Sequence, residues 1–203
     1  MQESQRITAQ SSEGQREVRC ASAQSAPHQR IILDRLLAAH EGYFDVERDH
    51  RFGGRAFDGY AQFHSSAERY VLTKRAKLWG VNVHEHMFFL CCDELTSEEL
   101  VDLTNFMTTT ALEKVQPNPE HMTTYLTLVV IASAATDDVH RAVRRTRFRK
   151  NLRFGLQGWV DLRLALVVLG GQEGGAPSHA RITTNSQGKK LRETLEKNTH
   201  TGV

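Results

Sequence analysis

The chain has 203 residues, of which 39% are hydrophobic and 25% are charged, and its formal net charge at pH 7 is +2. A chain of this length can bury a full core within one domain, and a net charge this small excludes a polycation, so any affinity for nucleic acid must come from local clustering of charge. Three cysteines without C-x-x-C spacing and the lack of an apolar run near the ~20 residues that span a bilayer predict a cytoplasmic protein with no membrane partner.

The amino-terminal segment is polar, and the residues after it have helical spacing. Residues 1–27 are rich in Gln, Ser, Glu and Arg and have almost no large apolar side chains, so burial cannot offset the entropy lost on ordering. We therefore predict a disordered tail over 1–27 and one globular α+β domain over 28–199. Apolar residues at helical spacing then predict a helix over 29–41 that packs one face on a core.

Several strands follow this helix. A strand begins near Tyr43, a Gly-Gly pair at 53–54 is typical of a hairpin turn, and the chain returns as a strand over 55–64. Further strands are predicted near Tyr70 and over 81–91.

A strong helix-start signal comes next. Thr96 can act as a hydroxyl cap, and the carboxylates up to Glu99 suit the donor-rich first turn of a helix. We predict this helix over 96–115, followed by a strand over 122–133 that is rich in β-branched residues. The strands on either side of the helix are therefore expected to be parallel neighbours joined by a crossover.

The periodicity of the chain changes at Phe148. Residues 137–147 have the spacing of a short helix, whereas Phe148, Leu152, Phe154 and Leu156 alternate with polar residues as in a half-buried strand. The alternative is one continuous helix that runs on to about residue 154. We favour the strand, with its aromatic residues facing the core.

The hairpin that follows is predicted from register. A three-residue loop over 157–159 pairs Leu156 with Val160 and Phe154 with Leu162, which keeps one apolar face toward the core. A two-residue loop mixes core and solvent faces, and Gly158 can adopt the positive φ that the longer loop needs.

These elements predict an α+β (mixed α/β) fold, with a single twisted mixed sheet of about seven strands flanked by about four helices. The centre of the sheet is expected to consist of the strands at 81–91, 122–133 and 160–169. The remaining elements are a glycine-rich surface loop, a short strand and a charged final helix, at 170–178, 181–185 and 188–198.

Basic residues cluster in the middle of this plan. Seven cations and no acid lie in the thirteen residues 141–153, and guanidinium groups bind oxyanions through paired donors. On a strand, alternate arginines project from one face at ~6.6 Å steps, which resembles the spacing of phosphates along a single strand. The candidate residues for binding nucleic acid or another polyanion are Arg144, Arg145, Arg147, Arg149 and Arg153.

The alternative for this arginine-rich surface is a solvated face without a ligand. Asp161 on the returning strand, and the carboxylates of the 96–115 helix, can neutralise these arginines. Aromatic stacking partners would favour binding of nucleic acid, but Phe148 and Phe154 are expected to face the core, which argues against it.

Two histidines suggest a second kind of site. On a strand, His84 and His86 share a face, as in pairs that ligate metal from a sheet. Asp58 is the third candidate ligand, and His64 and His121 are further options if neighbouring strands align. The alternative is the polar edge of a strand.

The element order is also compatible with a restriction-endonuclease-like core, a resemblance of topology only. Such nucleases place an acid on one strand, for which Asp58 is available, and Glu-x-Lys on the next. Here Glu85 is followed by His86-Met87, which puts an active nuclease in doubt. The sequence contains no P-loop, no G-x-S-x-G motif, no dinucleotide fingerprint and no HExxH motif, and we expect no cofactor.

Three segments resemble an uncharacterised family of small prokaryotic proteins, a domain of unknown function. They are HMTTYLTLVVIAS at 121–133, FRKNLRFGLQGWVDLRLALVVL at 148–169 and TTNSQGKKL at 183–191. The similarity runs from about residue 43 to 195, and the glycine-rich loop looks like an insertion. The resemblance implies no activity, cofactor or catalytic residue.

The preferred hypothesis is a non-catalytic cytosolic module that binds nucleic acid or another polyanion through the arginine-rich surface at 141–153. The first alternative is a metal-dependent enzyme, hydrolase or nuclease-like, that uses His84, His86 and Asp58. The second is a protein-interaction or oligomeric scaffold, because the sequence does not fix the oligomeric state.

Overall fold

A computed structural model describes most of the chain, namely residues 27–67, 81–118, 121–170 and 180–199. The predicted tail apart from Pro27, the strand predicted near Tyr70 and almost all of the glycine-rich loop lie outside the described residues. None of the helices within these ranges has the length and apolar character needed to cross a membrane.

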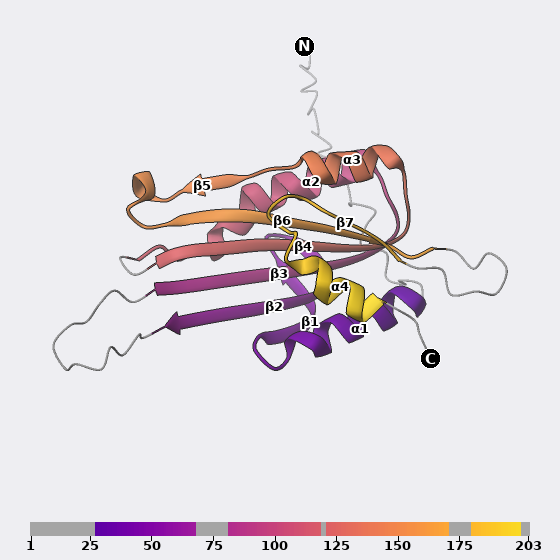
Figure 1. The fold of residues 1–203 in the computed structure, drawn as a ribbon, viewed down its shortest axis with the longest axis horizontal. Helices are drawn as coiled ribbons and strands as arrows, with labels where there is room; N and C mark the ends of the chain where they lie inside the picture. The colour runs from indigo at the N-terminus through magenta and orange to yellow at the C-terminus, as the bar shows by residue number, and fades with distance from the viewer. Residues whose placement is uncertain (1–26, 68–80, 119–120, 171–179, 200–203) are drawn as a thin grey trace, which may run out of the picture.

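The described residues form a seven-stranded mixed sheet with four α-helices (Figure 1), which confirms the predicted fold class. The strands are β1 (Asp45–Phe52), β2 (Arg55–Ala67), β3 (Val81–Leu95), β4 (His121–Ala135), β5 (Arg149–Asn151), β6 (Trp159–Val168) and β7 (Arg181–Thr184). The helices are α1 (Pro27–His40), α2 (Ser97–Thr108), α3 (Asp137–Arg145) and α4 (Leu191–Thr199), with short 3-10 helices η1 (Thr110–Lys114) and η2 (Arg153–Gly155).

The order of strands across the sheet is β1-β2-β3-β4-β6-β5, and β7 also pairs with β6. β3, β4 and β6 are parallel neighbours, whereas β1, β2, β5 and β7 run antiparallel to the strands they pair with. The predicted crossover between β3 and β4 through α2 is therefore confirmed, as is the central position of these three strands.

Local signals in the sequence account for the ends of several elements. Thr96 and Glu99 form a reciprocal capping box at the start of α2, so two backbone donors are satisfied there. Thr136 caps α3 in the same position. Gly53 and Gly54 have φ values of +57° and +77° and form the two-residue turn between β1 and β2.

The chain after α3 is extended, as predicted, but its register with β6 differs from the predicted one. The observed pairs join Arg149 with Asp161 and Lys150 with Val160. The connecting loop therefore runs from Leu152 to Gly158, not over three residues. One reason is the Arg149–Asp161 ion pair, which the observed register makes possible, because a buried carboxylate needs a partner.

This longer loop leaves apolar side chains outside the core. Phe154 and Leu156 are 103% and 84% exposed, so the prediction that they face the core is wrong. Phe148 and Leu152 do pack against the core, as predicted. Gly158 has a φ of +72°, and a Cβ there would lie 2.0 Å from the carbonyl oxygen of Met122, so only glycine fits where the loop crosses β4.

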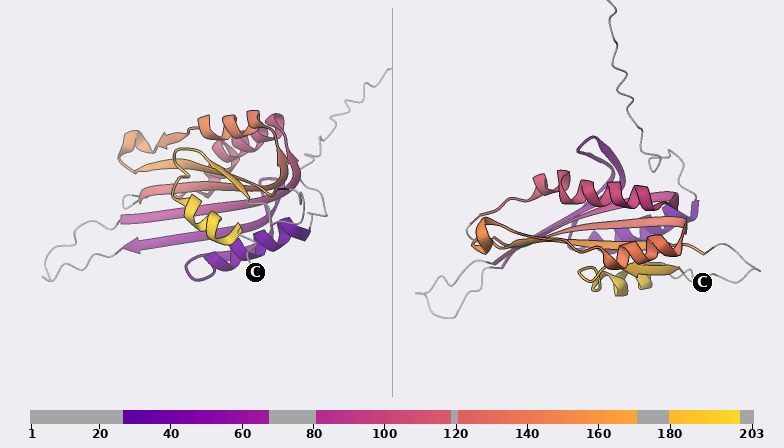
Figure 2. Two further views of the ribbon diagram at one scale, coloured as in Figure 1. Left: turned by 45° about the vertical axis from the view of Figure 1, so that its right-hand side comes forward. Right: turned by 90° about the horizontal axis from the view of Figure 1, so that it is seen from above.

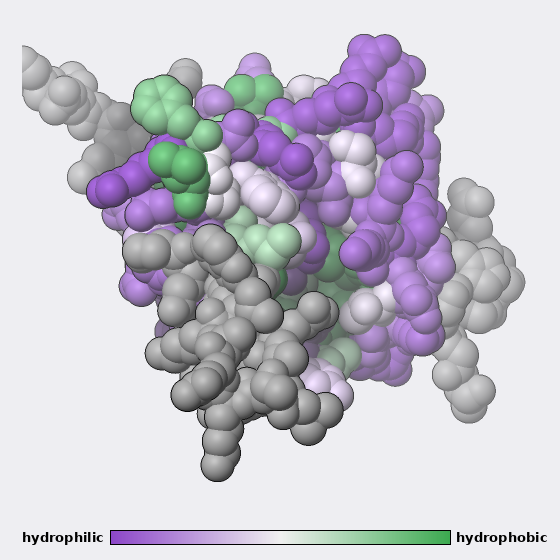
Figure 3. All heavy atoms as spheres, turned by 60° about the vertical axis from the view of Figure 1, so that its left-hand side comes forward, coloured by the Kyte–Doolittle hydropathy of each residue, from purple (hydrophilic) through white to green (hydrophobic). Residues whose placement is uncertain are grey.

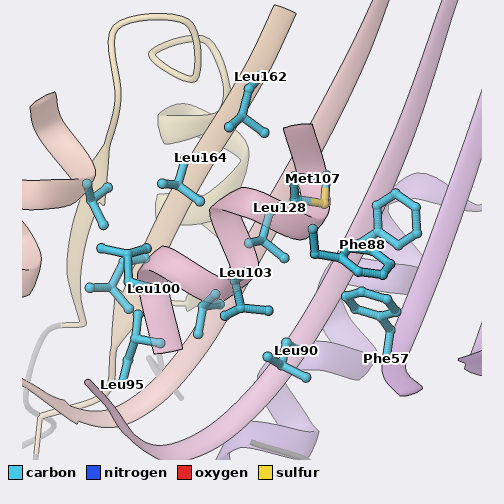
Figure 4. Packing of buried hydrophobic residues seen from close by; sticks show 14 of the residues in the cluster. Phe57, Phe88, Leu90, Leu95, Leu100, Leu103, Met107, Leu128, Leu162 and Leu164 are labelled. Atoms are coloured by element: carbon cyan, nitrogen blue, oxygen red, sulfur yellow. The ribbon is translucent and has the colours of Figure 1, made fainter. Parts of the chain in front are cut away.

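Two apolar cores lie on opposite faces of the sheet, and Figure 2 shows the helices on either side of it. One core lies under α2 and α3, and Figure 4 shows how Leu100, Leu103 and Met107 of α2 pack over Phe88 of β3 and Leu128 of β4. The other core lies under α1 and α4. Cys91 and Cys92 are buried free thiols, one in each core.

The sheet face under α1 and α4 is apolar for only part of its length. Met87 and Phe89, Val129, and Ala165 belong to that core in the carboxyl-terminal halves of the three parallel strands. Closer to the amino-terminal ends, the same face carries charged and polar side chains. That polar half is the floor of the candidate site.

Candidate anion-binding site

A row of polar side chains crosses four strands on this face. Cross-strand pairing aligns Glu85 with Tyr125, Tyr125 with Asp161, and Asp161 with Arg149. Residues paired in this way point to the same side of a sheet. The row therefore runs from β3 through β4 and β6 to the edge strand β5.

Arg163 reaches back across the row and holds it together. Its Nη1 atom donates to both carboxylate oxygens of Glu85 at 2.9 Å, and the hydroxyl of Thr127 donates to the same carboxylate at 2.7 Å. The guanidinium carbon lies 3.4 Å from the centre of the Tyr125 ring, a close cation–π contact. Both members of this ion pair are nearly nine-tenths buried.

The outer edge of β6 has a gap that one buried side chain closes. β5 pairs with residues 159–161 and β7 with residues 165–168, so the backbone between them has no strand partner. Asn185 takes that place, because its Nδ2 donates to the carbonyl of Leu162 at 2.9 Å and its Oδ1 accepts from the N–H of Leu164 at 3.0 Å. The same Oδ1 accepts from Gly188 at 2.8 Å and so fixes the turn over residues 186–190.

This turn and the sheet together enclose a hollow of about 570 Å³, which we call the cationic pocket. Its floor comes from β4 and β6, one side from β5 and the residues before it, and the other side from the 186–190 turn. The lining residues are Tyr125, Arg147, Arg149, Asp161, Arg163, Ser186, Gln187, Lys189 and Lys190. Five of these nine side chains are cations and one is an acid, so the pocket is strongly positive.

The cations of the pocket differ in how they are engaged. Arg149 donates Nε and Nη2 to the two oxygens of Asp161, each at 2.7 Å, and this pairing raises the pKa of the guanidinium above its ordinary value. Within the described residues, no carboxylate forms an ion pair with Arg147, Lys189 or Lys190. These three charges face solvent and can receive an anion. Lys189 and Lys190 also directly precede α4, where the helix dipole favours negative charge.

Two of the five predicted arginines line this pocket. Arg147 and Arg149 are among its lining residues. Arg153 is not, because the strand ends at residue 151 and the chain turns with a φ of +44° at Arg153. Arg144 and Arg145 are exposed on α3 and do not line the pocket either.

The opposite face of the same strands carries four imidazoles, which we call the histidine row: His64, His84, His86 and His121. His64 and His84 are cross-strand partners, with their Nδ1 atoms 2.5 Å apart, so one ring donates and the other accepts. His121 stacks on His84 with ring centres 5.8 Å apart. The hydroxyl of Tyr60 lies 2.7 Å from Nδ1 of His86.

Two members of the histidine row, His84 and His86, have lowered pKa values. Burial, and then the positive potential of His64, Lys114 and His84, lowers the pKa of His86 to about 4. Burial also lowers the pKa of His84, with His64 and His121 acting in the same direction. His84 and His86 therefore favour their neutral forms more strongly than ordinary histidines do, in contrast to the cations across the sheet.

Asp58 does not join the two histidines that it was predicted to complete. His86 pairs with Gln62 on β2, and Asp58 is four residues from Gln62, which is ~13 Å along a strand. The Asp58 carboxylate accepts the N–H of Cys91 at 2.7 Å. Across the described ranges, no set of three or more His, Cys, Asp or Glu side chains is arranged to hold a metal ion. Of the options for a third ligand, Asp58 is therefore separated from His86, whereas His64 and His121 lie beside His84.

A family comparison covers all the segments that build the cationic pocket. The model of a domain of unknown function (DUF8052) matches residues 28–197. The chain belongs to this family. The match confirms the resemblance to a domain of unknown function that the sequence suggested, and it assigns no activity. No curated protein matches the chain in sequence.

Most of the DUF8052 pocket was not identified from the sequence. The candidate list did not include Arg163, Lys189 or Lys190. The sequence did contain two signals. The first is that the charged residues Asp161 and Arg163 interrupt a strand predicted to be central, where an unpaired charge costs free energy. The segment that contains Asn185 was also one of the three that carry the family resemblance, although nothing in it indicated a pocket.

Proposed function

We propose that this protein is a non-catalytic module that binds a phosphate-rich polyanion in the cationic pocket. The observation that supports this proposal best is that basic side chains from separate segments meet in one place. Five cations from three segments far apart in the sequence line one hollow, and the only acid among the lining residues, Asp161, already pairs with Arg149. Proteins retain such unneutralised charge at a cost in stability, because like charges repel.

These cations have different proposed roles, which follow from their contacts. Arg163 is committed to Glu85, and Arg149 to Asp161, so these two fix the shape and potential of the pocket. Arg147, Lys189 and Lys190 are exposed and supply the direct contacts. A hollow of this size matches a small anionic group or one unit of a longer chain.

Nucleic acid is the polyanion class that we propose first, and the cytosol is the proposed location. Cys91 and Cys92 are free thiols, which fits a reducing compartment. A pocket that uses about three phosphate contacts also predicts a steep dependence on salt, since bound counterions are released. For about three contacts with a single strand, affinity should fall roughly 20-fold between about 50 and 200 mM salt.

The test compares two variants that each lose two charges. Lys189→Ala/Lys190→Ala removes charge from the pocket, and Arg144→Ala/Arg145→Ala removes the same charge from exposed positions outside it. With linear polyphosphate as the probe, we expect the first variant to lose about tenfold or more in affinity and the second to lose less than about twofold.

Equal losses in the two variants would show attraction to the whole surface and overturn the proposal of a pocket. Absence of salt-dependent binding by the natural protein would overturn the proposed function itself. All four substitutions are at exposed positions, so both variants should fold, and circular dichroism of each checks this directly.

A further inference from the structure

The loop between β5 and β6 presents two large apolar side chains to solvent. Phe154 and Leu156 are the most exposed large hydrophobic residues of the described chain, at 103% and 84%. Met122, next to Gly158 at the base of the loop, is also exposed. Figure 3 views this end of the molecule, where apolar side chains protrude from a surface that is mostly hydrophilic. Packing among the described residues does not account for an apolar tip of this kind.

The backbone of the same tip is strained. Arg153 and Phe154 have φ values of +44° and +57°, a region that costs side chains other than glycine about 1 kcal/mol or more. Gly155 follows at +89°. A conformation that costs energy and displays a phenyl ring without burying it indicates a contact with another molecule.

The tip and the cationic pocket lie on one continuous path. β5 carries Arg149 on the pocket side, and the chain continues from β5 through Asn151 directly into the tip. The Arg149 guanidinium also lies 5.3 Å from the ring centre of Trp159, which follows the loop. A cationic hollow thus leads along one strand to an exposed aromatic ring.

The shape of this path selects among polyanions. A bilayer is flat, so its headgroups cannot enter a hollow between β5 and the 186–190 turn while the tip inserts. A nucleic-acid duplex has its bases stacked and paired, so it offers no free base face to Phe154. A single strand is narrow and flexible, and it presents phosphates and unstacked bases in alternation.

We infer that the ligand is a single-stranded nucleic acid, whose phosphates occupy the cationic pocket while one base stacks on Phe154. This inference rests on the proposed function and names its ligand class. The exposure of Phe154 also removes the argument against nucleic acid that a core-facing ring had supplied.

The experiment uses two probes that share phosphates but differ in bases. Fluorescence anisotropy measures binding of a labelled single-stranded oligothymidine of about 12 nucleotides, and unlabelled linear polyphosphate competes for the pocket. Phe154→Ala should weaken oligothymidine binding about tenfold, because stacking on one ring contributes that much, and leave polyphosphate binding unchanged. Phe154→Trp should restore the affinity, whereas Phe154→Leu should not.

Each of the other outcomes contradicts one part of the proposal. If Phe154→Ala and the natural protein bind oligothymidine with equal affinity, no base stacks on Phe154, but the proposal that the cationic pocket binds phosphate is not affected. Binding of polyphosphate without binding of oligothymidine rules out nucleic acid alone, and failure of both probes overturns the proposed function. Tyr43→Ala, which removes another exposed ring, should change neither affinity. If Phe154→Ala instead lowers binding to vesicles of anionic phospholipid and spares oligothymidine, the tip belongs to a membrane contact.

Discussion

The cationic pocket and the histidine row are two faces of the same short stretch of sheet. Alternate residues of β3 point to opposite sides, so Glu85 belongs to the pocket side while its neighbours His84 and His86 belong to the row. On the pocket side, guanidinium and ammonium groups stay charged across the physiological pH range. On the other side, burial lowers the pKa of His84 and His86 and so favours their neutral forms. The two faces of this stretch of sheet therefore differ in charge, because the pocket side carries cations and the row includes two histidines whose neutral forms are favoured.

The groups that bond to the basic side chains, and not the number of basic residues alone, decide which face of the sheet can bind an anion. Arg163 is fixed by Glu85, and Arg149 by Asp161, so the pocket keeps its shape while other cations remain available. The imidazoles of the histidine row bond mostly to one another and to neutral groups. Because burial favours the neutral forms of His84 and His86, these two imidazoles are poor partners for a phosphate.

The largest effect that we expect tests whether the floor of the pocket depends on its buried ion pair. Arg163→Met leaves the Glu85 carboxylate buried with only the hydroxyl of Thr127 among its bonded partners. An uncompensated buried charge costs about 3–5 kcal/mol, so the free energy of unfolding should fall by that amount in urea denaturation at pH 7.

Two further variants separate charge from packing at this position. Glu85→Gln/Arg163→Met removes both charges and should recover more than half of the loss, because no unpaired charge remains. Arg181→Met breaks an exposed pair with Asp137 and should leave stability nearly unchanged. A similar small effect for Arg163→Met would mean that water reaches Glu85 and that the ion pair does not hold the floor.

The next effect contrasts the two faces by pH. An unfolded histidine takes up a proton near pH 6.5, whereas folded His86 does so only near 4, so acid favours the unfolded state. The loss of stability begins below about pH 6.5 and is complete below about 4. At pH 5 it amounts to about 2 kcal/mol for this one residue, and His84, whose pKa is also lowered, acts in the same direction.

The variant His86→Gln checks this assignment, since glutamine can still bond to the Tyr60 hydroxyl but does not titrate. Its unfolding free energy should change less between pH 7 and pH 5 than that of the natural protein. Polyphosphate affinity of the folded protein should stay constant over the same range. Identical pH profiles for variant and natural protein would remove His86 as the source.

Local signals in the sequence predicted the fold well. The features that were predicted wrongly depend on contacts between residues far apart in the sequence. The capping box at Thr96 and the Gly-Gly turn at 53–54 each depend on neighbouring residues, so the sequence displays them directly. The predicted length of the loop after β5 was wrong, because the register of β5 depends on long-range contacts. Asp161 forms an ion pair with Arg149, and Gly158 fits closely against β4. Alternation of polar and apolar residues contains neither fact.

The candidate site divides in the same way. Arg147 and Arg149 were identified because they cluster in the sequence, whereas Lys189 and Lys190 lie about forty residues away. They reach the pocket only because Asn185 fills the gap in the edge of β6. Asp58 failed as a metal ligand for the corresponding reason, since its distance from His86 depends on strand register.

A smaller effect tests this dependence on Asn185. Asn185→Ala leaves three buried backbone groups without their partner, two on β6 and one at Gly188. Stability should fall by about 2 kcal/mol, and polyphosphate affinity should fall several-fold, because the 186–190 turn loses its anchor. Asn198→Ala, which removes one bond within α4, is the control and should spare the affinity. Full affinity in Asn185→Ala would show that the turn is positioned by other contacts.

The smallest expected change is a gain in stability at the loop tip. Phe154 holds a left-handed conformation that glycine adopts readily, and its ring buries nothing. Phe154→Gly should therefore raise the free energy of unfolding by up to about 1 kcal/mol, while oligothymidine binding falls as it does in Phe154→Ala. Tyr43→Gly, at an exposed residue without positive φ, should give no such gain. A substitution that stabilises the protein and weakens its binding would identify Phe154 as a residue kept for its contact with a ligand, whereas a loss of stability would show that the ring supports the fold after all.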